Sequence, residues 1–157
     1  MELPINKFDS ILNFQRKDIL PIIVSSETYI VGNISSSNSI RLEGIIEGEI
    51  YSKNKIIVDD AAIINGNIMA NNVEISGRVN GNIYCTNKVV LKNGAEVYGT
   101  IYSTQFKSED GSIFNNKLKL LNADVIVNIN YLNEEIKPRT NFHESETYNK
   151  LISYYTK

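Results

Sequence analysis

A spaced repeat constrains this chain more than any other feature of its sequence. A Gly-x-Ile step recurs along the chain, beginning at Gly32, Gly48, Gly66, Gly81 and Gly99. The intervals between these glycines are 16, 18, 15 and 18 residues, so short and long intervals alternate. Self-similarity at such a period is typical of proteins in which each repeat is one structural unit stacked on the next. We therefore expect an elongated stack and not a globular domain with a central pocket.

The alternating intervals predict a larger unit of 33 residues, and residues 44–76 align with residues 77–109. Nine positions of the two units are identical, and six more exchange one aliphatic residue for another apolar one. Within each unit the apolar residues follow a period of two, which indicates strands. Side chains such as those of Leu42, Ile46 and Ile50 are expected to face inward. We expect Ser52 and its counterpart Cys85 to face outward.

A repeat of 15–18 residues is the length of one coil of a β-solenoid with three short faces. The sequence therefore predicts an all-β parallel β-helix of about six coils over residues 29–120, a rod roughly 25–30 Å long. A left-handed hexapeptide helix is the alternative, but it needs an aliphatic-Gly step every six residues, which this chain does not show. We favour the right-handed form, which is the usual sense of parallel crossovers.

The two flanks of the repeat differ from it in pattern. Residues 1–28 carry apolar residues at helical spacing, so this flank is expected to be helical or partly flexible. Its residues 5–24 either make a weak contact with a membrane or pack on the β-helix. Residues 121–157 contain an alternating run at 124–132, which predicts a strand, and helical spacing near 145–155, which predicts a short helix.

Composition excludes several classes of function. The formal net charge is −2 and no segment is strongly basic, so nucleic-acid binding is not expected. Cys85 is the only cysteine, which excludes an internal disulfide. The chain shows neither a signal peptide nor an apolar run long enough to cross a bilayer. We therefore expect a soluble cytoplasmic protein.

Three segments of the repeat resemble a known family. Residues 42–50 (LEGIIEGEI) and 75–83 (ISGRVNGNI) are similar to the recurring Ile-Glu-Gly-x-Val-x-Gly-x-Ile of the bactofilins, and residues 106–116 resemble the terminal coil of that family. The resemblance implies a right-handed β-helix that polymerises end to end without nucleotide. It also implies a scaffold, often at the inner face of the cell membrane, that organises cell-wall enzymes or membrane proteins and shapes the cell.

The two ends of the stack are the predicted assembly site. A terminal coil exposes unpaired backbone groups and the apolar side chains of its layer, and such edges invite pairing. The residues expected in the polymer interface are Ile30, Ile34, Ile40 and Leu42 at one end and Phe106, Ile113, Phe114 and Leu118 at the other. The alternative is that these are ordinary core residues covered by the flanks, in which case the protein is a non-polymerising β-helix adaptor.

One column of large side chains follows the repeat glycines at a distance of three residues and is expected to face outward. It consists of Tyr51, Met69, Tyr84 and Tyr102. This column is either a lateral docking stripe for a partner or a second filament, or a stacked ladder that seats one of the flanks.

The sequence does not support an enzyme, a cofactor site or a metal site. His143 is the only histidine and lies outside the repeat, so the coils lack the catalytic histidine that β-solenoid acyltransferases need. Polysaccharide lyases need clustered carboxylates, whereas the acidic residues of the repeat are dispersed. Cys85 has no base at repeat spacing, and Asp59-Asp60 has no acidic counterpart in the next unit.

Overall fold

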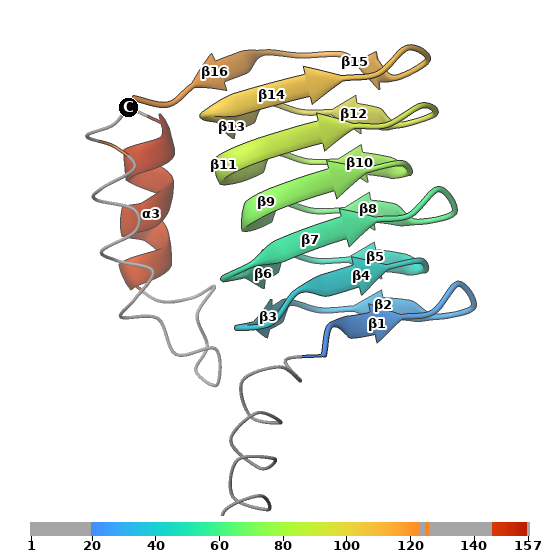
Figure 1. The fold of residues 1–157 in the computed structure, drawn as a ribbon. Helices are drawn as coiled ribbons and strands as arrows, with labels where there is room; N and C mark the ends of the chain where they lie inside the picture. The colour runs from blue at the N-terminus through green and yellow to red at the C-terminus, as the bar shows by residue number, and fades with distance from the viewer. Residues whose placement is uncertain (1–19, 123–124, 126–145, 157) are drawn as a thin grey trace, which may run out of the picture.

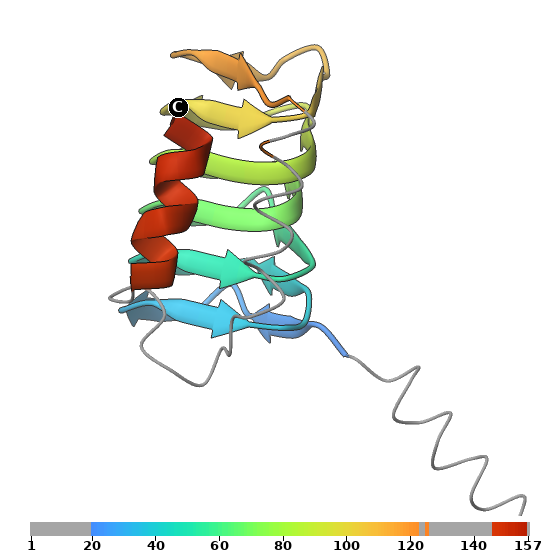
Figure 2. The same cartoon turned by 90° about the vertical axis from the view of Figure 1, so that its left-hand side faces the viewer.

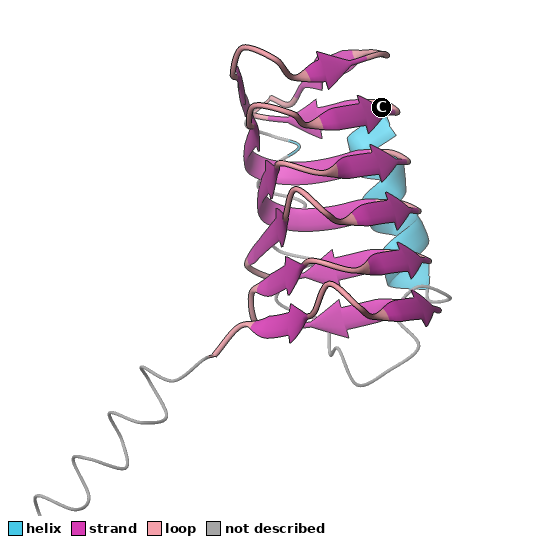
Figure 3. Cartoon of the chain, turned by 90° about the vertical axis from the view of Figure 1, so that its right-hand side faces the viewer, coloured by secondary structure: helices cyan, strands magenta, loops and turns pink. Residues whose placement is uncertain are grey.

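The computed structural model of the chain describes residues 20–122, 125 and 146–156. These residues form a parallel β-solenoid of about six coils, with one short helix near the C-terminus (Figures 1 and 3). The predicted all-β, three-faced solenoid is thus confirmed, while its right-handed winding stays a prediction. Every strand pairs in parallel with the equivalent strand of the next coil, since each coil returns the chain to the same face.

Each coil contributes one strand segment to each of three faces. The first face holds β2 (Tyr29–Val31), β5 (Ile45–Glu47), β8 (Ile63–Asn65), β10 (Arg78–Asn80), β12 (Glu96–Tyr98) and β15 (Ile113–Phe114). The second face holds β3 (Ile34–Ser36), β6 (Ile50–Ser52), the first parts of β9 (Ile68–Ile75) and β11 (Ile83–Leu91), β13 (Ile101–Ser103) and β16 (Leu118–Leu120). The third face holds β1 (Ile22–Val24), β4 (Ile40–Leu42), β7 (Lys55–Val58), the second parts of β9 and β11, and β14 (Gln105–Ser108).

The core is a set of aliphatic columns, because the register places equivalent residues of successive coils directly above one another. On the first face Ile46, Ile64 and Val79 follow each other in register, and all three are fully buried. Leu42 and Ile50 are buried on the other faces, as the alternation predicted. No single coil could bury these side chains alone, so the stacking of coils creates the core.

The repeat glycines stack at the corner between the first and second faces. A Cβ atom on Gly81 would collide with the carbonyl oxygen of Gly66, and one on Gly99 would collide with that of Gly81. This corner therefore needs glycine because two backbones approach closely. A φ near that of a left-handed helix occurs at two glycines away from this corner, Gly94 (φ 86°) and Gly111 (φ 85°).

An asparagine ladder runs beside these glycines. The side-chain oxygens of Asn33, Asn67 and Asn82 accept hydrogen bonds from the backbone N–H groups of Glu49, Asn82 and Thr100, at 2.9, 2.9 and 3.0 Å. Each bond joins one coil to the next. The ladder thus satisfies backbone donors at the corner, where the strand pairing is interrupted.

Helix α3 (Glu146–Thr156) lies along the second face and runs parallel to the solenoid axis (Figure 2). It occupies the span in which helical spacing predicted a short helix. The predicted strand at 124–132 lies outside the described residues, apart from Val125. Most of the predicted N-terminal flank also lies outside them.

The solenoid begins before the expected boundary at residue 29. Strand β1 pairs with β4, so that Ile22 lies beside Ile40 and Val24 beside Leu42. The run that contains β1 carries no glycine step, and its alternation is short, so the sequence did not reveal it as part of the first coil.

Candidate functional site

The N-terminal end of the solenoid presents an apolar layer. We call the inward-facing residues of its first coil the N-terminal layer, and these are Ile22, Val24, Ile30 and Ile34. Ile30 and Ile34 are partly buried and pack on the core below them, while Ile22 is 38% exposed. Among the described strands, β1, β2 and β3 each pair on one side only, with β4, β5 and β6. This end therefore offers both apolar surface and unpaired strand edges.

The C-terminal end presents a layer of larger side chains. The C-terminal layer consists of Phe106, Phe114, Leu118 and Leu120, which continue inward columns of the core. The rings of Phe106 and Phe114 lie with their centroids 5.8 Å apart across the end of the solenoid. Leu120 is 64% exposed although its register partner Ser103 is fully buried. In the described residues no further strand pairs with β16, and Leu120 is correspondingly exposed.

Two residues predicted at the N-terminal end lie elsewhere. Ile40 and Leu42 belong to the second coil and are fully buried, because β1 covers them. Their expected place in the terminal layer was wrong, and Ile22 and Val24 take it. The repeat was counted from the first glycine step, and β1 precedes that glycine.

One residue predicted at the C-terminal end points away from it. Ile113 lies in register with Glu96, an outward residue, whereas its neighbour Phe114 lies in register with the buried Val97. The placement of Ile113 in the end layer was therefore wrong. Leu120 was missed, although its alternation with Leu118 could have indicated it.

Helix α3 lies over the second face (Figure 2). Its side chains cover the outward column of that face, which we call the tyrosine stripe. The stripe consists of Tyr51, Met69, Tyr84 and Tyr102. Helix α3 contributes three buried side chains to the contact, those of Tyr148, Leu151 and Tyr155. Of the two interpretations of this column, the structure shows a seat for the C-terminal flank.

The contact between α3 and the stripe is aromatic and desolvated. Tyr84 and Tyr102 stack with centroids 5.1 Å apart and planes inclined by 6°, as neighbouring coils require. Tyr155 meets these two rings edge-on at 5.2 and 6.5 Å. Burial raises the pKa of Tyr155 and of Tyr51 well above the ordinary value of 10.0, because the phenolate would lose its hydration.

A polar contact fixes the start of α3. The hydroxyl of Tyr148 donates a hydrogen bond to the carboxylate of Glu49, and it interacts with Asn67. The side-chain amide of Asn67 also donates to Glu49 at 3.1 Å. The first turn of α3 is thereby tied to the asparagine ladder. Burial, followed by the hydrogen bond to Glu49, raises the pKa of Tyr148.

The chain matches the family of polymer-forming cytoskeletal bactofilins over residues 22–119. The match covers more than half of the sequence and coincides with the coils. This chain belongs to the bactofilin family. No curated protein and no solved structure is significantly similar to it.

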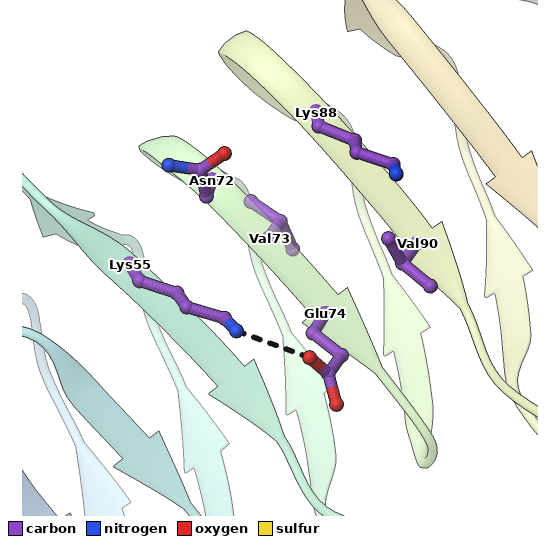
Figure 4. Close-up of a pocket in the computed structure, with 6 residues that line it drawn as sticks. All are labelled: Lys55, Asn72, Val73, Glu74, Lys88 and Val90. Atoms are coloured by element: carbon purple, nitrogen blue, oxygen red, sulfur yellow. Dashed lines mark hydrogen bonds and ion pairs between the residues drawn. The ribbon is translucent and has the colours of Figure 1, made fainter.

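A pocket of about 230 Å³ lies on the third face of this bactofilin (Figure 4). It is lined by Lys55, Asn72, Val73, Glu74, Lys88 and Val90. The ammonium of Lys55 pairs with the carboxylate of Glu74 at 3.1 Å, which occupies the only carboxylate of the lining. Within the described residues, no three His, Cys, Asp or Glu side chains gather as a metal site would require.

The side chain of Cys85 faces the core of the bactofilin solenoid, so its expected outward orientation was wrong. Ser52 and Ser103 occupy the same column, and all three are fully buried or nearly so. The serine hydroxyls donate to corner carbonyls, as that of Ser52 does to Asn38 at 2.7 Å. These bonds explain how a polar residue is tolerated at an inward position. Burial raises the pKa of the Cys85 thiol to about 11, which disfavours a nucleophilic thiolate.

No helix in the described part of this bactofilin is long and apolar enough to cross a bilayer.

Proposed function

We propose that this bactofilin assembles end to end into filaments without nucleotide, and that the filaments organise cell-shape or cell-wall factors. The family match supports a polymer-forming cytoskeletal protein. The observation that supports the end-to-end arrangement is a difference in exposure between residues of the same core column. Ile101 and Ser103 are fully buried by the coils on either side, while Leu118 and Leu120, next in register, are 38% and 64% exposed.

A second subunit can bury such a layer. Its terminal coil has the same three-faced cross-section and carries unpaired N–H and C=O groups along the same three strand directions. Stacking at the coil spacing of about 4.8 Å continues both the backbone pairing and the aliphatic columns. The same physics that joins one coil to the next inside the chain thus favours joining one chain to the next.

Assembly of this kind would need no nucleotide, because the apolar end layers themselves, with Leu118 and Leu120 38% and 64% exposed, would drive it. Phosphate-binding proteins hold the nucleotide at glycine-rich loops that precede a helix. In the described residues the glycines lie at solenoid corners and not before a helix. We expect the same filaments after treatment with apyrase and EDTA as before it.

A filament of this kind would present the outward first and third faces as repeating surfaces for client proteins. We propose cell-wall enzymes or membrane proteins as these clients, and no catalytic activity of the chain itself. We further propose a weak contact of residues 5–24 with the cytoplasmic face of the membrane. The exposure of Leu20 (70%) and Ile23 (60%) at the described end of this segment supports that contact.

The alternative adaptor, with both ends capped by the flanks, draws no support from α3. This helix is the described part of the C-terminal flank beyond Val125, and it lies along the side of the solenoid (Figure 1).

The test is a pair of substitutions on one strand. Phe114→Arg places a charge in the C-terminal layer, where a covering subunit would bury it at high cost. Ile113→Arg makes a comparable change one residue away, on an outward side chain. Electron microscopy of negatively stained full-length protein should show long filaments for wild type and Ile113→Arg, and short oligomers for Phe114→Arg. Normal filaments from Phe114→Arg, with an unchanged circular dichroism spectrum, would contradict end-to-end assembly.

The N-terminal end is tested in the same way. Ile30→Arg changes the N-terminal layer, and Val31→Arg changes an outward residue that is 70% exposed. We expect only Ile30→Arg to shorten the filaments. Sedimentation measures the assembled fraction of all four variants on one scale.

A further inference from the structure

The tyrosine stripe is an apolar surface that extends over four of the six coils. Its four large side chains stand on coils two to five, and the equivalent positions on the first and last coils are Ser35 and Lys119. Polar residues thus close the stripe at both ends. Under α3 the exposed fractions of Tyr51, Met69 and Tyr84 are only 1–4%. Without the helix, a continuous apolar strip would face solvent on every subunit.

The helix that covers the stripe is a separate element of the chain. In the described residues it makes no backbone pairing with the solenoid. Its buried side chains Tyr148, Leu151 and Tyr155, with the partly buried Ile152 and Tyr154, pack on the second face, and the Tyr148 hydroxyl bonds to Glu49. A helix of 11 residues is marginal in water on its own, so its order depends on this seat. Its loss would leave the coils intact, because no core column contains one of its residues.

We propose that the tyrosine stripe is a second assembly surface, which pairs side by side with the stripe of a second copy of this chain when α3 leaves it. Helix α3 is then the element that keeps filaments single. The inference rests on the proposed function, since it concerns contacts between filaments.

The repeat favours a second copy as the occupant. Two stripes have the same axial spacing by construction, about 4.8 Å per coil, so their side chains can interdigitate along the whole length. A helix matches this spacing less closely, because its turns rise about 5.4 Å. Charge favours the antiparallel arrangement. Glu49 lies beside the stripe on the second coil and Lys119 ends it on the sixth, so a two-fold axis brings each Glu49 toward the Lys119 end of the other copy.

The stripe is too small for two isolated chains to pair stably, so we expect pairing only between filaments. Three tyrosines and a methionine offer at most roughly 600 Å² on each copy, since Tyr84 and Tyr102 already cover part of each other. A stable interface buries about 800 Å² on each side. One pair of chains is therefore too weak. Two filaments repeat the contact at every subunit. Once one pair of stripes has met, the neighbouring pairs are held close together, so many weak contacts give a strong association.

The experiment displaces α3 in the full-length protein. Leu151→Glu puts a charge at a fully buried position of the helix, and Ser153→Glu makes a comparable change in charge at an exposed position of the same helix. Hydrogen exchange of the α3 amides reports whether the helix has left its seat. If Leu151→Glu leaves these amides protected, the double variant Leu151→Glu/Tyr155→Glu replaces it.

With α3 released, we expect filaments to associate into ribbons, and the fraction pelleted at low speed to rise at least about tenfold. Ser153→Glu filaments should stay single. Adding Tyr84→Ser and Tyr102→Ser to the released variant should restore single filaments. Released α3 with filaments that remain single would overturn the inference. Absence of filaments from the wild-type protein would instead contradict the proposed function.

Discussion

The ring of Tyr155 meets the ring of Tyr84 edge-on, with their centroids 5.2 Å apart. The contact joins the C-terminal helix to the fourth coil of the solenoid. Because Tyr84 stacks on Tyr102 of the fifth coil, one helical side chain touches two coils. The second face is thereby distinguished from the other two, although all three are built from the same kind of strand.

Removing this ring should loosen α3 and leave the solenoid folded. Tyr155 is 1% exposed, and truncation of a buried aromatic side chain costs about 3–5 kcal/mol. We expect Tyr155→Ala to speed hydrogen exchange of the α3 amides strongly while the amides of β9 and β11 stay protected. Ser153→Ala, at an exposed position of the same helix, should change neither. Unchanged protection of α3 in Tyr155→Ala would show that the ring contact does not hold the helix.

Alkaline pH should destabilise the fold through Cys85. Burial raises the pKa of this thiol from 9.0 to about 11, because the core disfavours the thiolate. The stabilisation linked to the neutral thiol is complete below pH 9 and is lost as the pH rises to about 11. A shift of this size corresponds to about 3 kcal/mol. Urea unfolding at several pH values across this interval measures the loss.

The matched variant for this prediction is Cys85→Ser, since serine occupies the same column at Ser52 and Ser103. Its unfolding free energy should fall less steeply with pH. Buried tyrosines with raised pKa values, such as Tyr51, act in the same direction, so some loss remains in the variant. Identical pH profiles of the two proteins would refute the assignment to the thiol.

Two glycines should differ in their response to alanine. At Gly81 a methyl group would meet the backbone of Gly66, which cannot move without disturbing the coil below. At Gly94 the nearest atom is 3.9 Å away, and the cost comes from a φ of 86°. We expect Gly94→Ala to lose about 1–2 kcal/mol. Gly81→Ala should lose more, about 3 kcal/mol or above. Thermal unfolding of both variants checks the order, and the reverse order would refute the close-approach explanation.

The asparagine ladder should contribute more per residue than exposed asparagine pairs. Asn82 accepts a hydrogen bond from the backbone N–H of Thr100 at 3.0 Å, so Asn82→Ala leaves a partly buried donor without its partner and should cost about 1–3 kcal/mol. The side-chain amide of Asn80 donates to the exposed side chain of Asn65, at 2.7 Å, and not to a backbone group. Asn80→Ala should therefore cost no more than about 0.5 kcal/mol. Equal losses in chemical denaturation would contradict a structural role of the ladder.

Much of the fold was predictable because its rules are local and repeated. The 33-residue unit and the period of two correctly predicted that Leu42, Ile46 and Ile50 lie in the core. Where the prediction departed from the alternation, it was wrong. Cys85 follows Ile83 by two residues and must share its inward face, but the polar Ser52 at the equivalent position suggested the opposite. The corner carbonyls that satisfy such residues are not visible in sequence.

The candidate site was predicted less well, because it depends on where the repeat begins and ends. Strand β1 lacks the glycine step but still forms part of the first coil. Because it covers β4, Ile40 and Leu42 lie in the second coil and not in the end layer. At the other end Phe114 is inward as expected, while Ile113 is outward and Leu120 joins the layer. A shift of one residue exchanges the two faces of a strand, so end layers are sensitive to register.

The sequence alone was enough to predict that residues 29–120 form a stack of coils. Gly-x-Ile spacing and apolar alternation repeat every coil, and only stacking can bury such a pattern. The tertiary structure decided which surface each end offers and which lateral face is covered. The contact of Tyr155 with Tyr84 depends on a helix folding back over four coils. No periodicity encodes such a contact, because it joins a non-repeating segment to a repeating one.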